Sequence, residues 1–329
     1  MLATGGTIAS ASTQTGLTPL LTSEDVLQYL NDIDRICEVE AIQLCNLDST
    51  NISQEHWLMM AKAIKDSYDK YDGFVITHGT DTMAYTASAL SYLIQHSPKP
   101  IVITGSQKPI NMEISDSRVN LYASFLYASS DYASGVQILF DGKVILGTRA
   151  RKTHSKSFHA FSSINYPFLA LIQDDKILQY IAGKEEGTPV FYDKLNAKVG
   201  LLKLIPGMDS DVLNFLLEKN DAVIIESYGV GGIPSLEKYH YYEVIEKWME
   251  LGRTIVMTTQ VPNEGSDMNI YKVGQKLKRH FNILEAYDMT TEAVVTKLMW
   301  ILGQTNEPSE IRRLFYTTIS NDLLYKETE

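Results

Sequence analysis

The fold of this chain is decided by residues 74–83, which read FVITHGTDTM. A short apolar run ends at Gly79, and apolar residues then recur at spacings of three and four from Met83 to Ile94. That spacing predicts an amphipathic helix directly after a buried strand. Two hydroxyls and a carboxylate therefore stand at the carboxyl end of a strand, the edge of a parallel sheet where ligands bind.

The amino terminus repeats this chemistry in residues 3–9, which read ATGGTIA. Its two glycines allow the backbone to approach a ligand closely, and Thr7 follows them directly. A third apolar run, at residues 101–104, leads into Ser106. Because parallel strands end at one edge of their sheet, we expect Thr7, Thr80 and Ser106 to lie at the same edge.

Strand-like and helix-like patterns alternate up to about Phe140, which predicts βαβ units and a parallel sheet with helices on both faces. The pattern weakens where glycine, proline and charged residues gather, and a second alternating set follows. We therefore predict an α/β protein with a larger N-terminal parallel-sheet domain at 1–183, a linker at 184–198 and a smaller C-terminal α/β domain at 199–329.

The composition argues against several classes of partner. The 329 residues include 29 basic and 40 acidic ones, a net charge of −11, without a dense Lys/Arg cluster, so neither nucleic acid nor a membrane surface is expected. No membrane-length apolar run and no secretory signal is visible. Cys37 and Cys45 lie beside apolar residues, which favours buried thiols in a reduced, cytoplasmic compartment. No metal-ligand or phosphate-loop spacing occurs, so we expect no metal and no cofactor.

The segments at 3–9 and 74–83, in this order, resemble the two signature segments of the bacterial-type L-asparaginases, in the cytoplasmic type I branch. The likeness extends to five further stretches and covers nearly the whole chain: 42–57, 71–106, 142–166, 199–232 and 288–303. The resemblance implies a flavodoxin-like N-terminal domain. It also implies hydrolysis of a linear amide, L-asparagine, to L-aspartate and ammonia through a threonine nucleophile and an acyl-enzyme intermediate.

The resemblance also implies catalytic roles for Thr7, Thr80, Asp81 and Lys152. Amide hydrolysis by a threonine needs a hydroxyl, a proton acceptor and donors for the oxyanion. Thr7 matches the nucleophile, and Thr80 matches the family's second catalytic threonine. Lys152 matches the lysine that works with Thr80 and Asp81, where it can share protons with both. Taken alone, such a threonine is more often a helix cap, and such a lysine more often a solvated surface charge.

The remaining matches concern the substrate. Ser49 matches the position that holds the α-carboxylate, and Thr50 is its neighbour in the pocket. Asp81 can bind the α-ammonium as a charge-assisted pair, and Ser106, with Thr80, lines the amide end of the pocket. The competing interpretation of the Ser49 segment is a plain helix cap.

One position departs from the family. Many members have a tyrosine in the mobile loop after the first motif, where this chain has Leu17, which cannot take part in proton transfer. In type I relatives a tyrosine from the neighbouring subunit is suggested for that role, and Tyr271 is the candidate here, although ordinary packing explains it equally well. A homodimer or homotetramer with active sites at subunit interfaces is therefore expected. His78 is interpreted as hydrogen-bonded structure rather than as a catalyst.

Two other functions compete with the asparaginase hypothesis. One is the amidase subunit of an archaeal-type Glu-tRNA(Gln) amidotransferase, which has similar motifs and usually carries an extra amino-terminal region. The other is an amino-acid-binding sensor without turnover. Leu17 suggests it, and so does a short first strand, which has only Met1, Leu2 and Ala3 before Thr4. Release of ammonia from free asparagine would separate all three.

Overall fold

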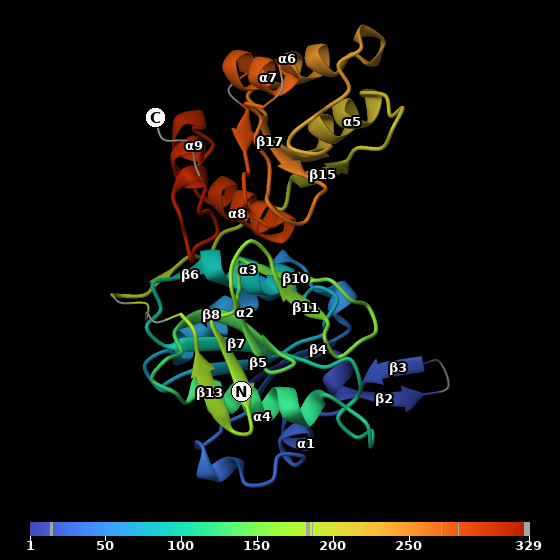
Figure 1. Ribbon diagram of the computed structural model, residues 1–329. Coiled ribbons are helices and arrows are strands. Elements are labelled where there is room, and N and C mark those ends of the chain that lie inside the picture. Colours follow the sequence, from blue (N-terminus) through green and yellow to red (C-terminus); the bar gives the residue numbers. More distant parts are fainter. Residues whose placement is uncertain (14–15, 182–184, 186, 271, 282, 326–329) are drawn as a thin grey trace. The chain divides into compact units, whose positions relative to one another are not determined.

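The computed structural model describes residues 1–13, 16–181, 185, 187–270, 272–281 and 283–325. The chain forms two compact units, Met1–Asp193 and Lys194–Glu329 (Figure 1). The division falls inside the predicted linker, and the exact domain bounds stay a prediction.

An eight-stranded sheet forms the centre of the N-terminal unit. Its strands, from edge to edge, are β13 (Lys176–Gln179), β12 (Ala170–Gln173), β9 (Lys143–Leu146), β8 (Gly135–Phe140), β7 (Pro100–Thr104), β5 (Phe74–Thr77), β1 (Leu2–Gly5) and β4 (Ile42–Leu47). The run from β8 to β4 is parallel, and β9, β12 and β13 extend it in antiparallel fashion. Strand β1 has only four residues, but all are buried, and it pairs with a neighbour on each side.

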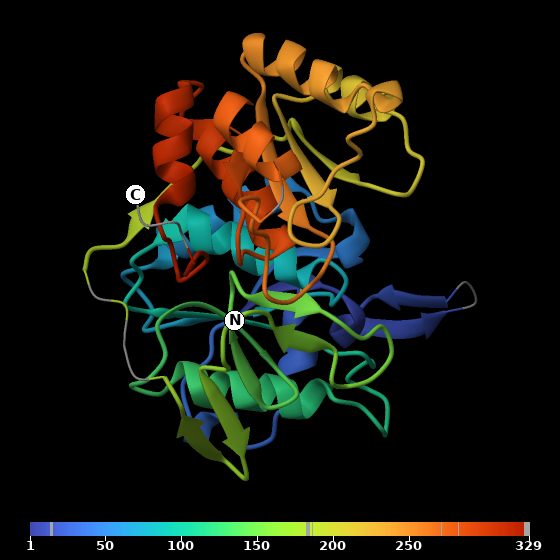
Figure 2. The ribbon, with the colours of Figure 1, turned by 45° about the horizontal axis from the view of Figure 1, so that its top comes forward.

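Helices cover both faces of this sheet. In Figures 1 and 2, α2 (Gln54–Ser67) and α3 (Met83–Leu93) lie on one face, and α1 (Ser23–Leu27) and α4 (Ser117–Ala128) on the other. The predicted helix after Gly79 is confirmed as α3, and its residues Met83, Ala87 and Leu90 are fully buried. Its predicted end is one residue too late. Ile94 has the extended φ of −130° and begins β6 (Ile94–Gln95), which pairs with β14 (Val190–Phe191).

Two hairpins of the N-terminal unit lie outside the large sheet. The first, β2 (Ser10–Thr13) and β3 (Gly16–Pro19), follows the first motif and projects from the body of the unit (Figure 2). The second, β10 (Ala150–Lys152) and β11 (Phe161–Ser163), carries Lys152 at the end of its first strand. The second hairpin thus bears a predicted catalytic residue, and the first follows the turn that contains Thr7.

The C-terminal unit is a smaller α/β layer structure. Its parallel sheet has the order β15 (Val199–Lys203), β16 (Ala222–Ser227), β17 (Thr254–Thr259) and β18 (Leu284–Glu285). One face packs against α5 (Asp211–Lys219), α6 (Tyr241–Glu250) and α7 (Lys272–Phe281) around a common apolar core. Helix α8 (Thr291–Gln304) covers the other face, and α9 (Pro308–Tyr316) packs on α8. The two layered units confirm the predicted α/β fold class.

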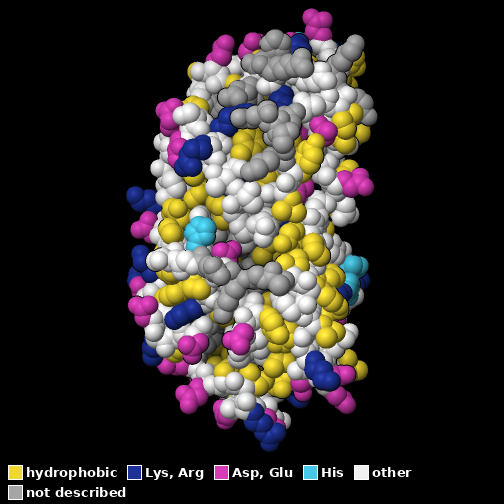
Figure 3. Space-filling model, turned by 60° about the vertical axis from the view of Figure 1, so that its left-hand side comes forward, with side chains coloured by type: hydrophobic (Ala, Val, Ile, Leu, Met, Phe, Trp, Pro, Cys, Tyr) yellow, Lys and Arg dark blue, Asp and Glu magenta, His cyan; other side chains and the backbone are white. Residues whose placement is uncertain are grey.

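Two further expectations can be compared with the structure. Cys37 and Cys45 are free thiols, but both are only partly buried, so the expectation of buried thiols is wrong. Within the described ranges, none of the helices is long and apolar enough to cross a membrane. On the face drawn in Figure 3, the described Lys and Arg side chains are scattered among Asp and Glu side chains, which agrees with the absence of a basic cluster in the sequence.

Candidate active site

The two motifs with the predicted catalytic threonines meet at the carboxyl ends of adjacent strands. Strand β1 leads into Gly6 and Thr7, and β5 leads into Gly79 and Thr80. A Cβ added to Gly6 would lie 2.3 Å from the Gly79 nitrogen, and Gly6 has a φ of +79°. The glycines are therefore required because the two backbones touch. As predicted, Thr7, Thr80 and Ser106 stand at the same edge of the sheet, since β7 lies beside β5.

Lys152 lies between the hydroxyl of Thr80 and the carboxylate of Asp81, the two groups that the family resemblance predicts as its partners. Its Nζ is 2.7 Å from Thr80 Oγ1 and 2.6 Å from Asp81 Oδ1. The Thr80 residue is 5% exposed, whereas the side chains of Lys152 and Asp81 are 18% and 57% exposed. A largely buried ammonium thus connects a buried hydroxyl to a carboxylate that solvent can reach. Such a group can pass protons between its neighbours.

Ser49 is buried against the second motif, while its neighbour Thr50 is not. The Asp81 backbone N–H donates to Ser49 Oγ at 3.3 Å, and Thr82 Oγ1 donates to the Ser49 carbonyl at 2.7 Å. Ser49 is 3% exposed. Thr50 is exposed and its hydroxyl donates to Asp48 Oδ1, so the structure does not bring it to the other site residues. The helix-cap role expected for this segment belongs to Ser53, the residue before α2, whose backbone N–H donates to His56 Nδ1.

His78 is held as structure beneath the second motif. Its Nδ1 donates to the Gly79 carbonyl at 2.7 Å, and its Nε2 accepts from the Thr86 hydroxyl at 2.9 Å. The Trp57 indole N–H donates in turn to Thr86 Oγ1. Complete burial lowers the pKa of His78 to about 4, an effect that the bond to Gly79 opposes. A neutral imidazole therefore fixes the Gly79 carbonyl, one residue before Thr80.

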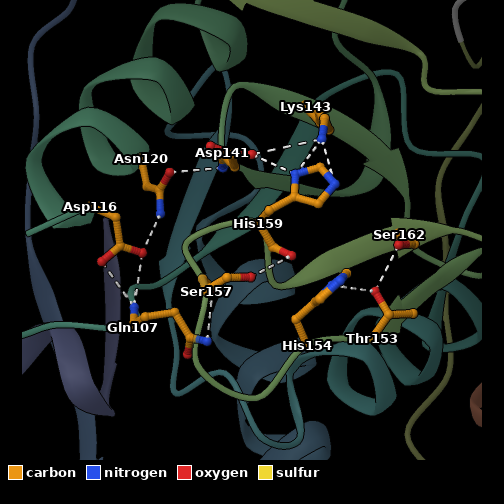
Figure 4. Close-up of polar contacts among 10 residues, drawn as sticks. All are labelled: Gln107, Asp116, Asn120, Asp141, Lys143, Thr153, His154, Ser157, His159 and Ser162. Atoms are coloured by element: carbon orange, nitrogen blue, oxygen red, sulfur yellow. Dashed lines mark hydrogen bonds and ion pairs between the residues drawn. The ribbon is translucent and has the colours of Figure 1, made fainter.

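Ser106 turns its side chain into its own turn, because its hydroxyl donates to the Lys108 carbonyl at 2.5 Å. The same turn holds Gln107, which the sequence reasoning missed. Thr80 Oγ1 donates to Gln107 Oε1 at 3.2 Å. The Gln107 backbone N–H donates to the carboxylate of Asp116, at the start of α4 (Figure 4). Burial raises the pKa of Asp116, and these backbone N–H donors oppose that rise. The only feature of the sequence that could have pointed to Gln107 is its polar side chain directly after Ser106.

Tyr271, the candidate for the role of the lid tyrosine, lies outside the described residues. Leu17 belongs to β3 and is 49% exposed. Within the described part of the chain, no three His, Cys, Asp or Glu side chains gather as a metal site would require.

The fold and this site define a two-unit α/β protein with a threonine–lysine–aspartate cluster at a sheet edge. Comparison with known proteins identifies the family. Residues 1–182 match the model "Asparaginase, N-terminal", and residues 198–315 match "Glutaminase/Asparaginase C-terminal domain". The chain belongs to the asparaginase family, as the resemblance in its motifs predicted.

Three relatives illustrate the range of this family. An L-asparaginase of Thermococcus kodakarensis is 40% identical over 98% of both chains. L-asparaginase 1 of Escherichia coli is 35% identical over 84% of this chain and 82% of its own length. A glutamyl-tRNA(Gln) amidotransferase subunit of Pyrococcus furiosus is 32% identical over 98% of this chain and 76% of its own length.

Solved structures agree with these relationships. The thermostable L-asparaginase from Thermococcus kodakarensis matches with a TM-score of 0.92 and 38% identity, over 99% of this chain and 98% of that one. A structure described as "Probable Cytoplasmic L-asparaginase" from Campylobacter jejuni matches with a TM-score of 0.81 and 27% identity, over 95% and 97% of the two chains. The fold of both units is thus that of L-asparaginases.

Proposed function

We propose that this protein is an L-asparaginase that hydrolyses L-asparagine to L-aspartate and ammonia. The observation that carries the proposal is the position of Lys152 between Thr80 and Asp81, at the edge where Gly6 and Gly79 bring the two threonine motifs into contact. The similarity to asparaginases along the full chain supports it.

The reaction uses two consecutive acyl transfers. Thr7 Oγ1 attacks the side-chain carbonyl carbon of asparagine, and its proton is transferred to the departing nitrogen, so that ammonia leaves and an ester forms on Thr7. Water then attacks the ester carbon, Thr7 regains a proton, and aspartate is released. Thr80, Lys152 and Asp81 take up and return the protons, because a lysine bonded to a hydroxyl and a carboxylate can exchange protons with both.

Substrate selection rests on Asp81 and Ser49. Asp81 Oδ1 is bonded to Lys152, and Oδ2 has no hydrogen-bond partner among the described residues, so Oδ2 is the oxygen that receives the α-ammonium. Ser49 holds the α-carboxylate at the buried side of the same turn. Ser106 contributes its backbone at the amide end, and Thr50 has at most an outer role because its hydroxyl is bonded to Asp48.

The active form is a homodimer or homotetramer in which Tyr271 of one subunit assists Thr7 of another. The support is Leu17, which leaves the lid loop without a phenol. Mixing inactive Thr7→Ala protein with inactive Tyr271→Ala protein should restore part of the activity, since mixed dimers contain one intact site. Heterodimers that form without any activity would remove Tyr271 from the mechanism.

The deciding experiment measures ammonia release from free L-asparagine by the purified chain, without tRNA or a partner protein. Turnover supports the asparaginase. The amidotransferase subunit is the second candidate because the Pyrococcus furiosus relative aligns with 98% of this chain. Ammonia release that requires tRNA and a second subunit would favour the amidotransferase subunit, and binding without release would favour a sensor.

A cytoplasmic location is also part of the proposal. It is supported by the similar Campylobacter jejuni structure, which is described as a probable cytoplasmic L-asparaginase, and by the two free thiols.

A further inference from the structure

One side chain connects the Thr80 hydroxyl to the hairpin that carries Lys152. Gln107 follows the end of β7, and its Oε1 accepts from Thr80 Oγ1 at 3.2 Å. Its Nε2 donates to the Ser157 carbonyl oxygen at 3.1 Å. Ser157 lies between β10 and β11, five residues after Lys152. In Figure 4 the Gln107 side chain extends from its turn toward this segment.

The contacts determine which way the Gln107 amide faces. A backbone carbonyl oxygen only accepts hydrogen bonds, so the amide nitrogen must face Ser157 and the amide oxygen must face Thr80. The amide oxygen also only accepts, so the single hydroxyl proton of Thr80 points at Gln107.

The proton of Thr80 therefore does not lie on the side of Lys152. A lysine ammonium only donates, so Thr80 Oγ1 uses one lone pair to accept from Lys152 at 2.7 Å. The second lone pair of Oγ1 has no partner among the described residues. It remains available to accept a hydrogen bond from an attacking hydroxyl or water.

Gln107 is itself firmly anchored. Its backbone N–H donates to both carboxylate oxygens of Asp116, at 2.9 and 3.1 Å, and the Lys108 N–H donates to the same carboxylate at 3.1 Å. The Asn120 amide nitrogen donates to Asp116 at 3.3 Å, and Asp116 is 7% exposed. A side chain held at both its backbone and its amide keeps one conformation, as a group that orients a reacting hydroxyl must.

We propose that Gln107 is a positioning residue, which holds the Thr80 proton away from Lys152 in the resting site and leaves the second lone pair of Thr80 Oγ1 free to accept a hydrogen bond from the nucleophile. This inference rests on the proposed asparaginase function. Without the amide, the Thr80 hydroxyl rotates freely, and its proton can occupy the direction from which the nucleophile should donate its hydrogen bond. The bound substrate does not touch Gln107 in this scheme, so the effect should fall on kcat and not on KM.

Two variants separate orientation from simple structural support. Gln107→Met keeps the length of the side chain but loses both hydrogen bonds, and it should lower kcat by about 10² with KM nearly unchanged. Gln107→Glu can still accept from Thr80 but cannot donate to Ser157, and it should keep kcat within about tenfold of wild type. If Gln107→Met keeps full kcat, or Gln107→Glu is no better than Gln107→Met, the proposal is wrong.

A second measurement does not depend on activity. Neutron diffraction of the wild-type protein, exchanged into D2O, locates the deuteron of the Thr80 hydroxyl. A deuteron directed at Gln107 Oε1 supports the proposal, and one directed at Lys152 overturns it. If the wild type releases no ammonia from asparagine, the proposed function fails, while the neutron structure still decides the role of Gln107.

Discussion

Gly79 provides a direct test of how closely the two motifs must fit. A Cβ at this position would lie 2.6 Å from Ser49 Oγ, 2.7 Å from Ser49 Cβ and 3.2 Å from Gly6 Cα. Ordinary van der Waals contact begins at 3.4 Å, and the added Cβ would lie 2.7 Å from Ser49 Cβ. Ser49 or the Gly79 backbone must therefore shift by 0.7 Å to restore an ordinary contact between these two atoms. The Gly79→Ala substitution therefore displaces either the proposed α-carboxylate site or the proposed catalytic pair that follows it.

The expected effect follows from this displacement. A misplacement of about 1 Å can cost about 10² in rate, so kcat/KM for L-asparagine should fall by nearly that factor. Overpacking should also lower the free energy of unfolding by about 1–3 kcal/mol. Steady-state ammonia release measures the first quantity, and urea unfolding measures the second.

Gly73→Ala is a matched control at the other end of the same strand. A Cβ on residue 73 would lie 2.7 Å from Pro100 Cγ, which is as close as the Cβ on residue 79 would come to Ser49 Cβ. Gly73, however, lies before β5, whereas Gly79 lies after this strand, on the side of the proposed site. Gly73→Ala should lose comparable stability and keep kcat/KM within about twofold of wild type. The reasoning is refuted if Gly79→Ala keeps more than about a third of wild-type kcat/KM, or if Gly73→Ala loses as much activity.

Three further outcomes are expected. Thr7→Ala and Thr80→Val should each lower kcat by about 10³–10⁶ while far-UV circular dichroism stays unchanged, and more than a tenth of wild-type ammonia release in both would exclude these hydroxyls. L-Asparagine should be strongly preferred over L-glutamine in kcat/KM, because an extra methylene misplaces the carbonyl against groups fixed on separate strand ends, and similar values would contradict this. The folded-state pKa of His78, about 4, lies below its unfolded value near 6.5, so the protein should lose a few kcal/mol of stability as the pH falls from about 6.5 to about 4.5. Urea unfolding of His78→Gln should show a shallower fall over that range, and an equal fall would remove His78 as the cause.

The sequence predicted those features that follow from strand order. Parallel strands end at one edge of their sheet, so the polar residues that follow β1, β5 and β7 must lie near that edge. This result does not depend on the sequences of the connecting loops. The position of Lys152 does not follow from this rule. It lies at the end of a short hairpin strand outside the main sheet, and only the family resemblance connected it with Thr80.

Side chains in turns were less predictable for a physical reason. Periodicity describes which face of a strand or helix is buried, but it does not describe where successive side chains of a turn point. Ser49 and Thr50 are neighbours, yet one is buried beneath the Asp81 turn and the other is bonded to Asp48 at the surface. Gln107 was missed for the same reason, since its role depends on a hairpin that returns fifty residues later.

Asp81 shows why the catalytic and binding roles must be considered together. A carboxylate that bound the α-ammonium with both oxygens would have to release Lys152, and a buried ammonium without its partner would be costly. The structure avoids this conflict because Lys152 uses Oδ1 alone and the rest of the side chain remains exposed. In the proposed complex, a substrate ammonium on Oδ2 would place one positive charge on each oxygen of the carboxylate. Asp81 could therefore serve both proposed roles at once, because Lys152 occupies only Oδ1 and the substrate would use Oδ2.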